Sequence, residues 1–286
     1  YTHRSYAFPG DERLKGTGFG WIYPRPPASE AMVRVETDGR VHTLAFDRPG
    51  AKNALTADAA TELVDALDAA ADAGARAVVL TGDGDAFCAG GDIEAMAARD
   101  ETPGEANDRV RETLTALIET LLTLPLPVIA KVNGDAVGAG TNVAAACDFA
   151  YAAADARFGE VFGNVGLIPD SGGTFLLPAL VGLRTAKELT MTGRLFDATE
   201  AAAMDLINRA VPAGDLDGEV ADLLSTLDRK PTETLGLTKR GLHENIGRPF
   251  RDALEREAYL QVIAYGSDAH ERGVEAFRND ERPEFE

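Results

Sequence analysis

The sequence of 286 residues is 45% hydrophobic, which suits one large domain or a domain with an appendage, and its formal net charge is -19. So acidic a chain repels phosphate backbones and anionic membrane surfaces, which excludes nucleic acid as an expected partner. No apolar run reaches the roughly 18 residues that span a bilayer, and residues 1–30 mix Pro, Gly and charge where a signal peptide needs an apolar segment, so we expect a cytoplasmic protein without membrane contact.

Cysteine and histidine are scarce, which limits the chemistry available to the chain. Cys88 and Cys147 are too few for a disulfide framework, and no His or second Cys stands at the spacing of metal ligands. We therefore expect no metal site. Only 6 of the 28 basic residues are Lys, and an acidic, Lys-poor surface suits a protein that stays soluble in strong salt. A halophilic source is one hypothesis, and an ordinary acidic cytosolic protein is the other.

The first part of the chain alternates between strand and helix patterns. Residues 1–31 are rich in Tyr, Phe, Gly and Pro without periodicity, which predicts an N-terminal arm. Alternating apolar positions on either side of Asp38-Gly39 predict a β-hairpin over residues 33–46. A helix is predicted from about residue 57 to residue 73, followed by a strand over residues 77–81.

The middle of the chain continues the same alternation. Apolar residues at helical spacing between residues 110 and 121 predict an amphipathic helix, and residues 127–132 predict a buried strand. Further strands are predicted at residues 149–152 and 207–211. Strands that alternate with helices in this way indicate an α/β core, which we place at residues 32–215.

Beyond residue 215 the strand signal disappears. Three helices are predicted near residues 216–228, 232–245 and 250–279, with prolines between them. Their apolar stripes expose more surface than a lone pair of helices can hide. We therefore expect residues 216–286 to form a helical region that packs on a neighbouring subunit.

A glycine-rich stretch, residues 133–142, joins a predicted strand to a helix that starts at about Thr141. Glycines at 134, 138 and 140 permit a tight turn and a close approach of the backbone to a ligand. The first N–H groups of the helix have no acceptor within the helix, so they suit an anion or a developing oxyanion. Taken alone, such a loop is equally compatible with an ordinary tight turn.

Three segments together resemble the signature loops of the enoyl-CoA hydratase/isomerase (crotonase) family in their order and spacing. They are residues 87–93 (FCAGGDI), 127–140 (PVIAKVNGDAVGAG) and 166–173 (GLIPDSGG), preceded by Arg48-Pro49 and residues 53–55 (NAL). The resemblance implies an α/β fold in which repeated ββα units form a spiral. It also implies an acyl-CoA substrate, no cofactor apart from the CoA of that substrate, and a C-terminal region that builds a homotrimer or a dimer of trimers.

The resemblance also implies the residues of a site. The backbone N–H groups of Gly91 and Ala139 would bind the thioester oxygen as it becomes an oxyanion. The CoA moiety is anionic, so positive charge must lie near it. Arg48 and Lys52 are the nearest candidates upstream and Lys239 is a further one, and all three are equally compatible with surface charges. The positions that would hold CoA are Arg48, Lys52, Ala54, Ala89, Asp92 and Ile93.

The chain departs from the family where hydratases carry two catalytic glutamates. Those positions hold Asn142 and Phe162, neither of which accepts a proton as a carboxylate does. Glu160 stands two residues before Phe162, but strand alternation favours the opposite side of the strand for its side chain. One acid remains, Asp170, at the position where the family's isomerases place their base; the alternative is that Asp170 caps the following helix.

These features favour one function and leave two alternatives open. The leading hypothesis is an acyl-CoA isomerase that resembles the ring-1,2-epoxyphenylacetyl-CoA isomerases and uses Asp170 as its proton shuttle. One alternative is a 2-enoyl-CoA hydratase that uses Glu160 or unusual groups. The other, of a different class, is a non-catalytic subunit that binds acyl-CoA.

Overall fold

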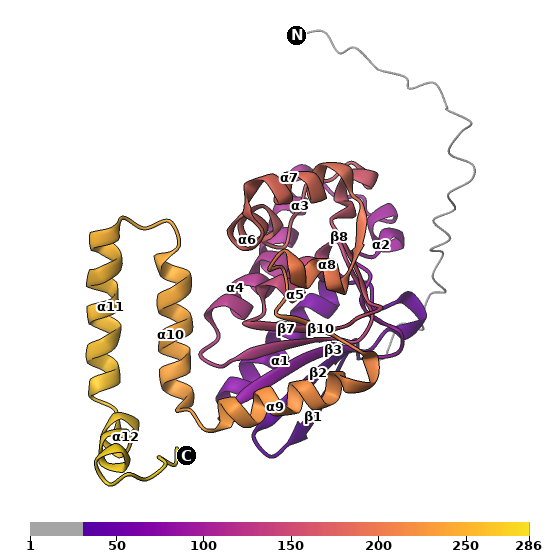
Figure 1. Ribbon diagram of the computed structural model, residues 1–286. Helices are drawn as coiled ribbons and strands as arrows, with labels where there is room; N and C mark the ends of the chain where they lie inside the picture. Colours follow the sequence, from indigo (N-terminus) through magenta and orange to yellow (C-terminus); the bar gives the residue numbers. More distant parts are fainter. Residues whose placement is uncertain (1–30, 286) are drawn as a thin grey trace, which may run out of the picture.

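The computed structural model describes residues 31–285, which form an α/β body and a set of helices that extends from it (Figure 1). The arm predicted at residues 1–31 therefore lies outside the described residues except for its last member. Within residues 31–285, no helix has the length and apolar character that crossing a membrane requires.

A six-stranded sheet forms the centre of the body. Its strands lie in the order β1-β2-β3-β5-β7-β10. Only β1 and β2 pair antiparallel, as the predicted hairpin, and the other neighbours are parallel. The bounds are β1 (Val33–Asp38), β2 (Val41–Phe46), β3 (Ala77–Gly82), β5 (Val128–Val132), β7 (Phe149–Ala153) and β10 (Arg209–Val211). These strands confirm the predicted ones.

Helices cover this sheet. Helix α1 (Ala57–Asp72) begins at Thr56, whose side chain accepts a hydrogen bond from Ala59 N, and it packs on β1 and β2. Helix α9 (Leu216–Asp228) packs on β5 and β7. Every residue of β3 is buried, as expected for a central parallel strand with both faces covered. The sheet is thus a rigid platform for the loops at its edge.

A second, smaller sheet was not predicted from the sequence. It consists of β4 (Ala86–Cys88), β6 (Asp135–Val137), β8 (Arg157–Gly159) and β9 (Leu195–Asp197), in that order. Three-residue strands are too short to show an alternating pattern. Each of the pairs β3–β4, β5–β6 and β7–β8 contributes one strand to each sheet before the chain turns into helix. This repetition confirms the expected ββα fold.

Shorter helices connect the two sheets. The predicted amphipathic helix is present but is interrupted, because Arg111–Thr115 forms a π-helical segment within it. Its apolar stripe is buried at Leu117, Ile118 and Leu121. The helices of this part are α2 (Ile93–Ala97), α3 (Pro103–Val110), α4 (Ala116–Thr123), α5 (Ala139–Ala146), α6 (Gly173–Leu180), α7 (Gly182–Thr192) and α8 (Ala198–Ala203).

The C-terminal part contains α9 and three further helices. The bounds are α10 (Thr232–Asn245), α11 (Phe250–Tyr265) and α12 (Asp268–Arg278). The single helix expected at 250–279 is therefore two helices. Helix α11 ends before Gly266, and the side chain of Ser267 accepts a hydrogen bond from His270 N, which caps the start of α12. In Figure 1, α10 and α11 stand side by side, away from the large sheet.

A buried ion pair joins α10 to the body. Lys239 Nζ lies 2.8 Å from Asp148 Oδ2 and donates to Leu126 O at 3.2 Å. Asp148 Oδ2 also accepts a hydrogen bond from Val128 N at 2.8 Å. Lys239 was considered from the sequence as a surface charge or a CoA contact; it is buried and paired instead, because α10 packs on α4 at this point.

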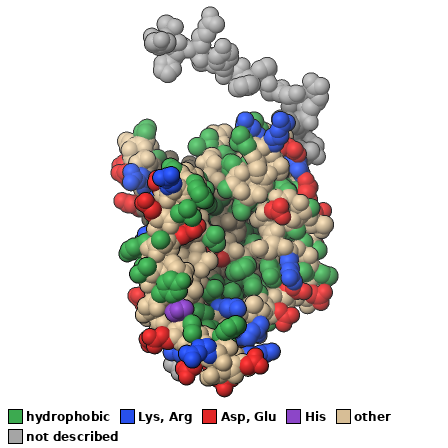
Figure 2. Space-filling view, turned by 60° about the vertical axis from the view of Figure 1, so that its left-hand side comes forward, with side chains coloured by type: hydrophobic (Ala, Val, Ile, Leu, Met, Phe, Trp, Pro, Cys, Tyr) green, Lys and Arg blue, Asp and Glu red, His purple; other side chains and the backbone are tan. Residues whose placement is uncertain are grey.

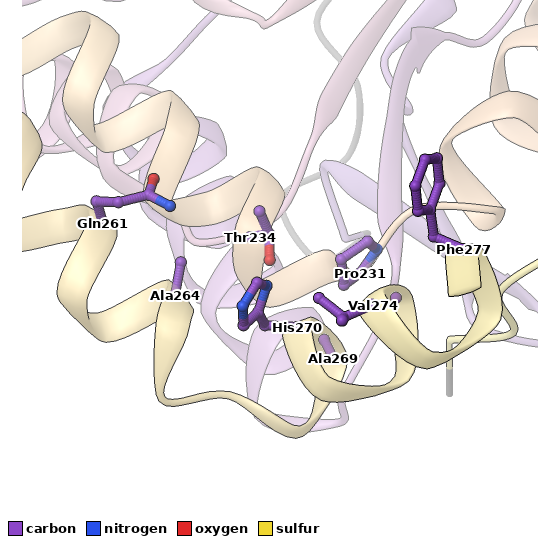
Figure 3. Close-up of a pocket in the computed structure, with 9 residues that line it drawn as sticks. Pro231, Thr234, Gln261, Ala264, Ala269, His270, Val274 and Phe277 are labelled. Carbon is purple, nitrogen blue, oxygen red and sulfur yellow. The ribbon is translucent and has the colours of Figure 1, made fainter.

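The helices beyond α9 carry a large apolar surface. Figure 2 shows hydrophobic side chains gathered around a hollow on this face. Exposed members include Phe250, Tyr259, Val262 and Phe277. A pocket of about 480 Å³ lies among α10, α11 and α12, lined by residues such as Pro231, Ala264 and Val274 (Figure 3). This surface supports the expectation that the region packs on a neighbouring subunit, which stays a prediction.

The buried pair between α10 and the body generates a first prediction. Lys239→Met removes the cation and leaves the Asp148 charge buried without it, so the free energy of unfolding should fall by about 3 kcal/mol. Arg240→Ala, in the same helix, removes an exposed pair with Glu244 and should leave stability nearly unchanged. Urea unfolding followed by circular dichroism measures both. Equal stabilities of the two variants would contradict the anchoring role.

Candidate active site

Two glycine turns touch at the edge of the small sheet. An ideal Cβ on Gly140 would lie 2.0 Å from the carbonyl oxygen of Cys88, and one on Gly90 would lie 2.8 Å from that of Val137. Gly90 also has a φ of +93°, which side chains rarely tolerate. The turn after β4 and the start of α5 therefore approach each other more closely than any other residue type would allow.

This contact brings two free N–H donors to one place. Helix α5 begins at Ala139, two residues before the predicted start, so the Ala139 N–H is the first of the helix. Among residues 31–285, neither the Gly91 N–H nor the Ala139 N–H donates a hydrogen bond. An ideal Cβ on Gly90 would lie 3.8 Å from Ala139 N, which shows how near the two turns are. Both donors are available to a ligand.

A third loop pairs with the first turn. Leu55 N donates to Gly90 O at 2.7 Å, Asp92 N donates to Leu55 O at 3.1 Å, and Ala89 N donates to Lys52 O at 3.0 Å. The structure thus brings together the six positions that the sequence assigned to CoA. They lie in two adjacent segments, Arg48, Lys52 and Ala54 in one and Ala89, Asp92 and Ile93 in the other.

Arg48 ties these two segments together. Its guanidinium donates to Ala54 O at 2.6 Å and to Asp92 Oδ2 at 2.9 Å. Burial works to raise the pKa of Asp92, but the Ala95 N–H and the Arg48 guanidinium outweigh it and hold that pKa below its ordinary value. The guanidinium of Arg48 is therefore engaged in contacts within the protein. Its contribution to a ligand site is to hold the loop that carries Gly91.

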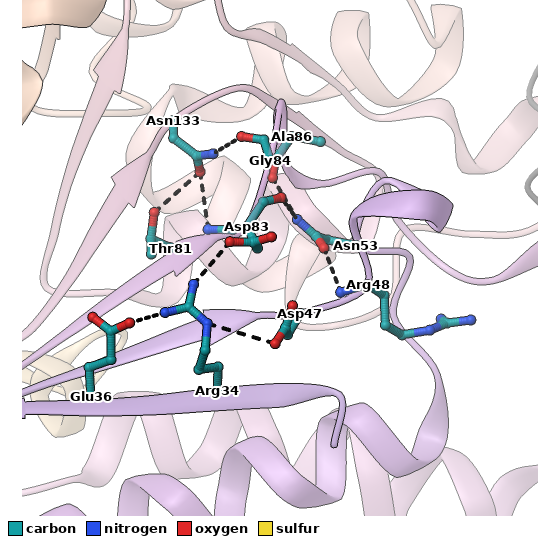
Figure 4. A network of polar contacts seen from close by, with 11 residues as sticks. Arg34, Glu36, Asp47, Arg48, Asn53, Thr81, Asp83, Gly84, Ala86 and Asn133 are labelled. Carbon is teal, nitrogen blue, oxygen red and sulfur yellow. Dashed lines mark hydrogen bonds and ion pairs between the residues drawn. The ribbon is translucent and has the colours of Figure 1, made fainter. Parts of the chain in front are cut away.

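A network of polar contacts holds the segment that leads into β4 (Figure 4). Asn53 Nδ2 donates to Asp83 O at 2.9 Å and to Ala86 O at 2.7 Å, and Asn133 Oδ1 accepts from Gly82 N at 3.0 Å. Arg34 pairs with Asp83 on the same turn. Because Asn53 is almost fully buried, its own bonds are shielded from water and hold the start of the β4 strand in position.

The two positions that depart from hydratases are both buried. Asn142 in α5 is fully buried, and its Nδ2 donates to Asp170 O at 2.8 Å. Phe162 lies in a 3-10 helix (Val161–Val165), and its ring is 3.8 Å from an ideal Cβ on Gly138. An amide and an aromatic ring thus occupy the interior beside the donor turn.

Asp170 stands in the turn that precedes α6. Ser171 Oγ donates to its Oδ1 at 3.0 Å, and the helix begins at Gly173 after Gly172, without a side-chain cap. The capping role considered from the sequence is therefore wrong. Burial raises the pKa of Asp170, while Ser171, Arg109 and Arg99 act in the opposite direction. Asp170 is a partly buried acid whose proton affinity is higher than usual.

Two arginines near Asp170 were not identified from the sequence. Arg109 in α3 makes a forked pair with Glu101, with its Nη2 2.7 Å from Glu101 Oε1. Arg99 lies between α2 and α3 and adds a second positive charge that acts on Asp170. They stand more than sixty positions before Asp170 in the chain, and no local motif marks them.

Glu160 is placed differently from the expectation. Strand alternation predicted that its side chain would face away, yet Glu160 is fully buried and both of its carboxylate oxygens lack a hydrogen-bond partner among residues 31–285. Burial raises its pKa to about 8; the Asn142 amide lowers it and the Asp170 charge raises it further. The alternation of side chains along β8 does not extend to Glu160, because β8 ends at Gly159 and the backbone turns there.

The described residues offer no other obvious chemistry. Among them, no cluster of His, Cys, Asp and Glu could hold a metal ion. Cys88 is buried beneath the donor turn, and burial raises the pKa of its thiol to about 11, so it is not a thiolate at neutral pH. The site thus consists of two N–H donors, one available acid and one buried acid.

Comparison with known proteins relates this site to a family. The sequence profile described as Enoyl-CoA hydratase/isomerase matches residues 36–286. A probable enoyl-CoA hydratase of Rhodobacter capsulatus is 37% identical over 88% of this chain and 97% of its own length. A 1,2-epoxyphenylacetyl-CoA isomerase of Escherichia coli is 34% identical over 86% of this chain and 94% of its own length. An enoyl-CoA hydratase structure from Mycobacterium smegmatis has a TM-score of 0.84 and 33% identity, covering 89% of this chain and 99% of that one.

The contact between the two glycine turns generates a second prediction. Gly140→Ala forces a Cβ onto the Cys88 carbonyl, so the free energy of unfolding should fall by about 3 kcal/mol as the turns separate. Gly218→Ala in α9 meets nothing within 4 Å and should be neutral or stabilise by up to about 1 kcal/mol. Urea unfolding compares them. A Gly140→Ala protein as stable as Gly218→Ala would show that the close contact is not required.

Proposed function

The chain belongs to the enoyl-CoA hydratase/isomerase family, and we propose that it shifts a carbon–carbon double bond in an acyl-CoA thioester. One observation carries this proposal. The positions of the two hydratase glutamates hold buried Asn142 and Phe162, while Asp170 is left as an acid that is not fully buried. A single base suffices for a double-bond shift, whereas the usual addition of water employs two carboxylates.

The proposed reaction moves one proton. The Asp170 carboxylate takes a proton from carbon 2 of a 3-enoyl-CoA, and the electron pair of that bond passes into a dienolate whose charge rests on the thioester oxygen. The same carboxyl group then returns the proton to carbon 4, which leaves the double bond between carbons 2 and 3. The raised pKa of Asp170 suits a group that must both accept and release a proton.

The dienolate requires stabilisation of its oxygen. We assign this role to the N–H groups of Gly91 and Ala139, which lie at the contact of the two turns and have no acceptor within the described chain. Fixed backbone donors need no reorganisation as charge develops, and loss of one such donor typically costs about 3 to 4 kcal/mol. The start of α5 adds the positive end of its helix dipole.

CoA would lie along the paired segments that lead to the donors. Lys52, Ala54, Ala89, Asp92 and Ile93 border that path, and we propose that they form the CoA site. Ile93 is half exposed, as a residue that covers an adenine or a pantetheine arm needs to be. Arg48 serves this site indirectly through its bonds to Ala54 and Asp92.

Hydration of a 2-enoyl-CoA is the second candidate. Relatives named as hydratases and the presence of Glu160 beside Asn142 favour it. Against it, the Glu160 carboxyl group is fully buried and is not exposed to solvent water. A non-catalytic acyl-CoA binding subunit is the candidate of another class, and the free N–H donors would serve it equally.

Asp170→Asn tests the proposal. The amide keeps the shape of the side chain but accepts no proton, so isomerisation of a 3-enoyl-CoA should fall by roughly 10³-fold with little change in acyl-CoA binding. Asp155→Asn, in an exposed turn, is the matched control and should retain full activity. Absorbance of the conjugated 2-enoyl thioester follows the reaction. Full activity of Asp170→Asn would refute the assignment.

The same assay separates the alternatives. Wild-type protein that hydrates crotonyl-CoA and does not isomerise would be a hydratase. Protein that binds acyl-CoA without incorporating solvent deuterium at carbon 2 would be a binding subunit.

The pH dependence of the wild-type protein gives a further prediction. Because the pKa of Asp170 is raised in the folded protein, protonation should disable the base at a higher pH than for an ordinary aspartate. The acidic limb of the kcat profile should therefore lie above the usual aspartate value of 3.8. If the acidic limb lies at or below 3.8, the group that titrates in this profile is not Asp170.

A further inference from the structure

Three buried oxygen atoms beside the Asp170 turn have no hydrogen-bond donor within the described part of the chain. They are Oε1 and Oε2 of Glu160 and Oδ1 of Asn142, and both side chains are fully buried. Buried polar atoms in folded proteins are almost always paired, because an unpaired one forfeits the hydrogen bonds that water would supply. An ionised carboxylate in this position would be costlier still. The three atoms therefore call for one common explanation.

The Asn142 amide is held in one orientation. Its Nδ2 donates to the carbonyl oxygen of Asp170 at 2.8 Å, and reversing the amide would set two oxygens against each other. The amide also packs against Gly173, where an ideal Cβ would lie 2.5 Å from Nδ2 and 2.9 Å from Oδ1. Asn142 Oδ1 therefore faces away from Asp170 O and needs a donor from another residue.

Glu160 supplies that donor if it carries a proton. A neutral carboxyl group has one O–H donor, whereas the carboxylate has none. Asn142 is the side chain that interacts with the Glu160 carboxyl group, whose pKa it lowers, and Asp170 is the charged group that acts on it and raises that pKa. A single proton on Glu160 would give Asn142 Oδ1 its missing hydrogen bond and would remove the charge from the buried carboxylate.

The surroundings divide charge between the two acids. Among residues 31–285, no cation opposes the effect of burial on Glu160, which raises its pKa to about 8. Burial raises the pKa of Asp170 as well, but there the Ser171 hydroxyl and the charges of Arg109 and Arg99 oppose it. Because cations act on Asp170 and none among the described residues acts on Glu160, a single proton shared by the two acids belongs on Glu160. Two charged carboxylates so close together would oppose each other.

We propose that Glu160 is a positioning residue, whose protonated carboxyl group donates to Asn142 Oδ1 and thereby keeps Asn142 Nδ2 on the carbonyl oxygen of Asp170. The turn that presents the Asp170 carboxylate is then held from the interior of the protein. Glu160 itself does not touch the substrate. The inference rests on the proposed function for its activity readout, and a stability measurement tests it without any reaction.

The activity experiment compares wild type, Glu160→Gln and Glu160→Leu between about pH 6 and pH 10. The wild-type kcat should decline above about pH 8 as Glu160 ionises. Glu160→Gln retains an N–H donor that does not titrate, so its kcat at pH 7 should stay within about threefold of wild type and the decline should move to higher pH. Glu160→Leu has no donor and should lose about tenfold or more in kcat with a nearly unchanged KM.

The stability experiment measures urea unfolding of wild type and Glu160→Gln from about pH 5 to pH 9. The unfolded chain releases the Glu160 proton near the ordinary value of 4.5, whereas the folded protein keeps it until about pH 8. Wild type should therefore lose stability relative to Glu160→Gln as pH rises through this window, and the gap should stop growing above it. Glu119→Gln, an exposed change in α4, is the control and should show no such gap.

These outcomes separate the two proposals. A pH-dependent stability gap in a protein without isomerase activity would leave the Glu160 inference standing and refute the proposed function. Isomerase activity that depends on Asp170, together with a pH-independent gap, would overturn the Glu160 inference alone. The inference is also overturned if Glu160→Leu matches Glu160→Gln in kcat and pH profile, since a hydrogen-bond donor would then be unnecessary.

Discussion

The structure depends on the contact between two glycine turns, where the start of α5 lies directly against the carbonyl oxygen of Cys88. Only a residue without Cβ allows this approach. The contact closes the small sheet between β4 and β6 and leaves the N–H groups of Gly91 and Ala139 unpaired. A structural requirement for glycine and a pair of donors thus arise from the same geometry.

The surrounding fold serves to keep that contact rigid. The large sheet carries β3 and β5, which lead through β4 and β6 to the two turns. Buried Asn53 donates to the backbone of Asp83 and Ala86, at the start of β4. Arg48 locks the neighbouring loop to Asp92. Backbone donors held in this way are fixed in position, which suits the oxyanion role that we propose for them.

The electrostatics of the site follow from differences in burial between two acids that lie close together. Glu160 is fully buried, and no cation among residues 31–285 acts on its carboxyl group, whereas Arg99 and Arg109 act on the partly buried Asp170. Desolvation favours the neutral form of the first, and nearby cations favour the charged form of the second. The arrangement thus sets one fully buried acid beside one partly buried acid that cations face, and the described residues hold no set of metal ligands near them.

The sequence by itself determined the elements that short-range patterns encode. It predicted the hairpin, the central strands, the amphipathic helices and the glycine turns, because backbone sterics and apolar periodicity act over a few residues. It also singled out Asp170 and the substitution of Asn142 and Phe162. Tertiary structure alone decided the second sheet, whose strands are too short to show a pattern, and the burial of Glu160 and Lys239. It also brought Arg99 and Arg109 to Asp170, since contacts between distant segments depend on packing of the whole chain and leave no local signal.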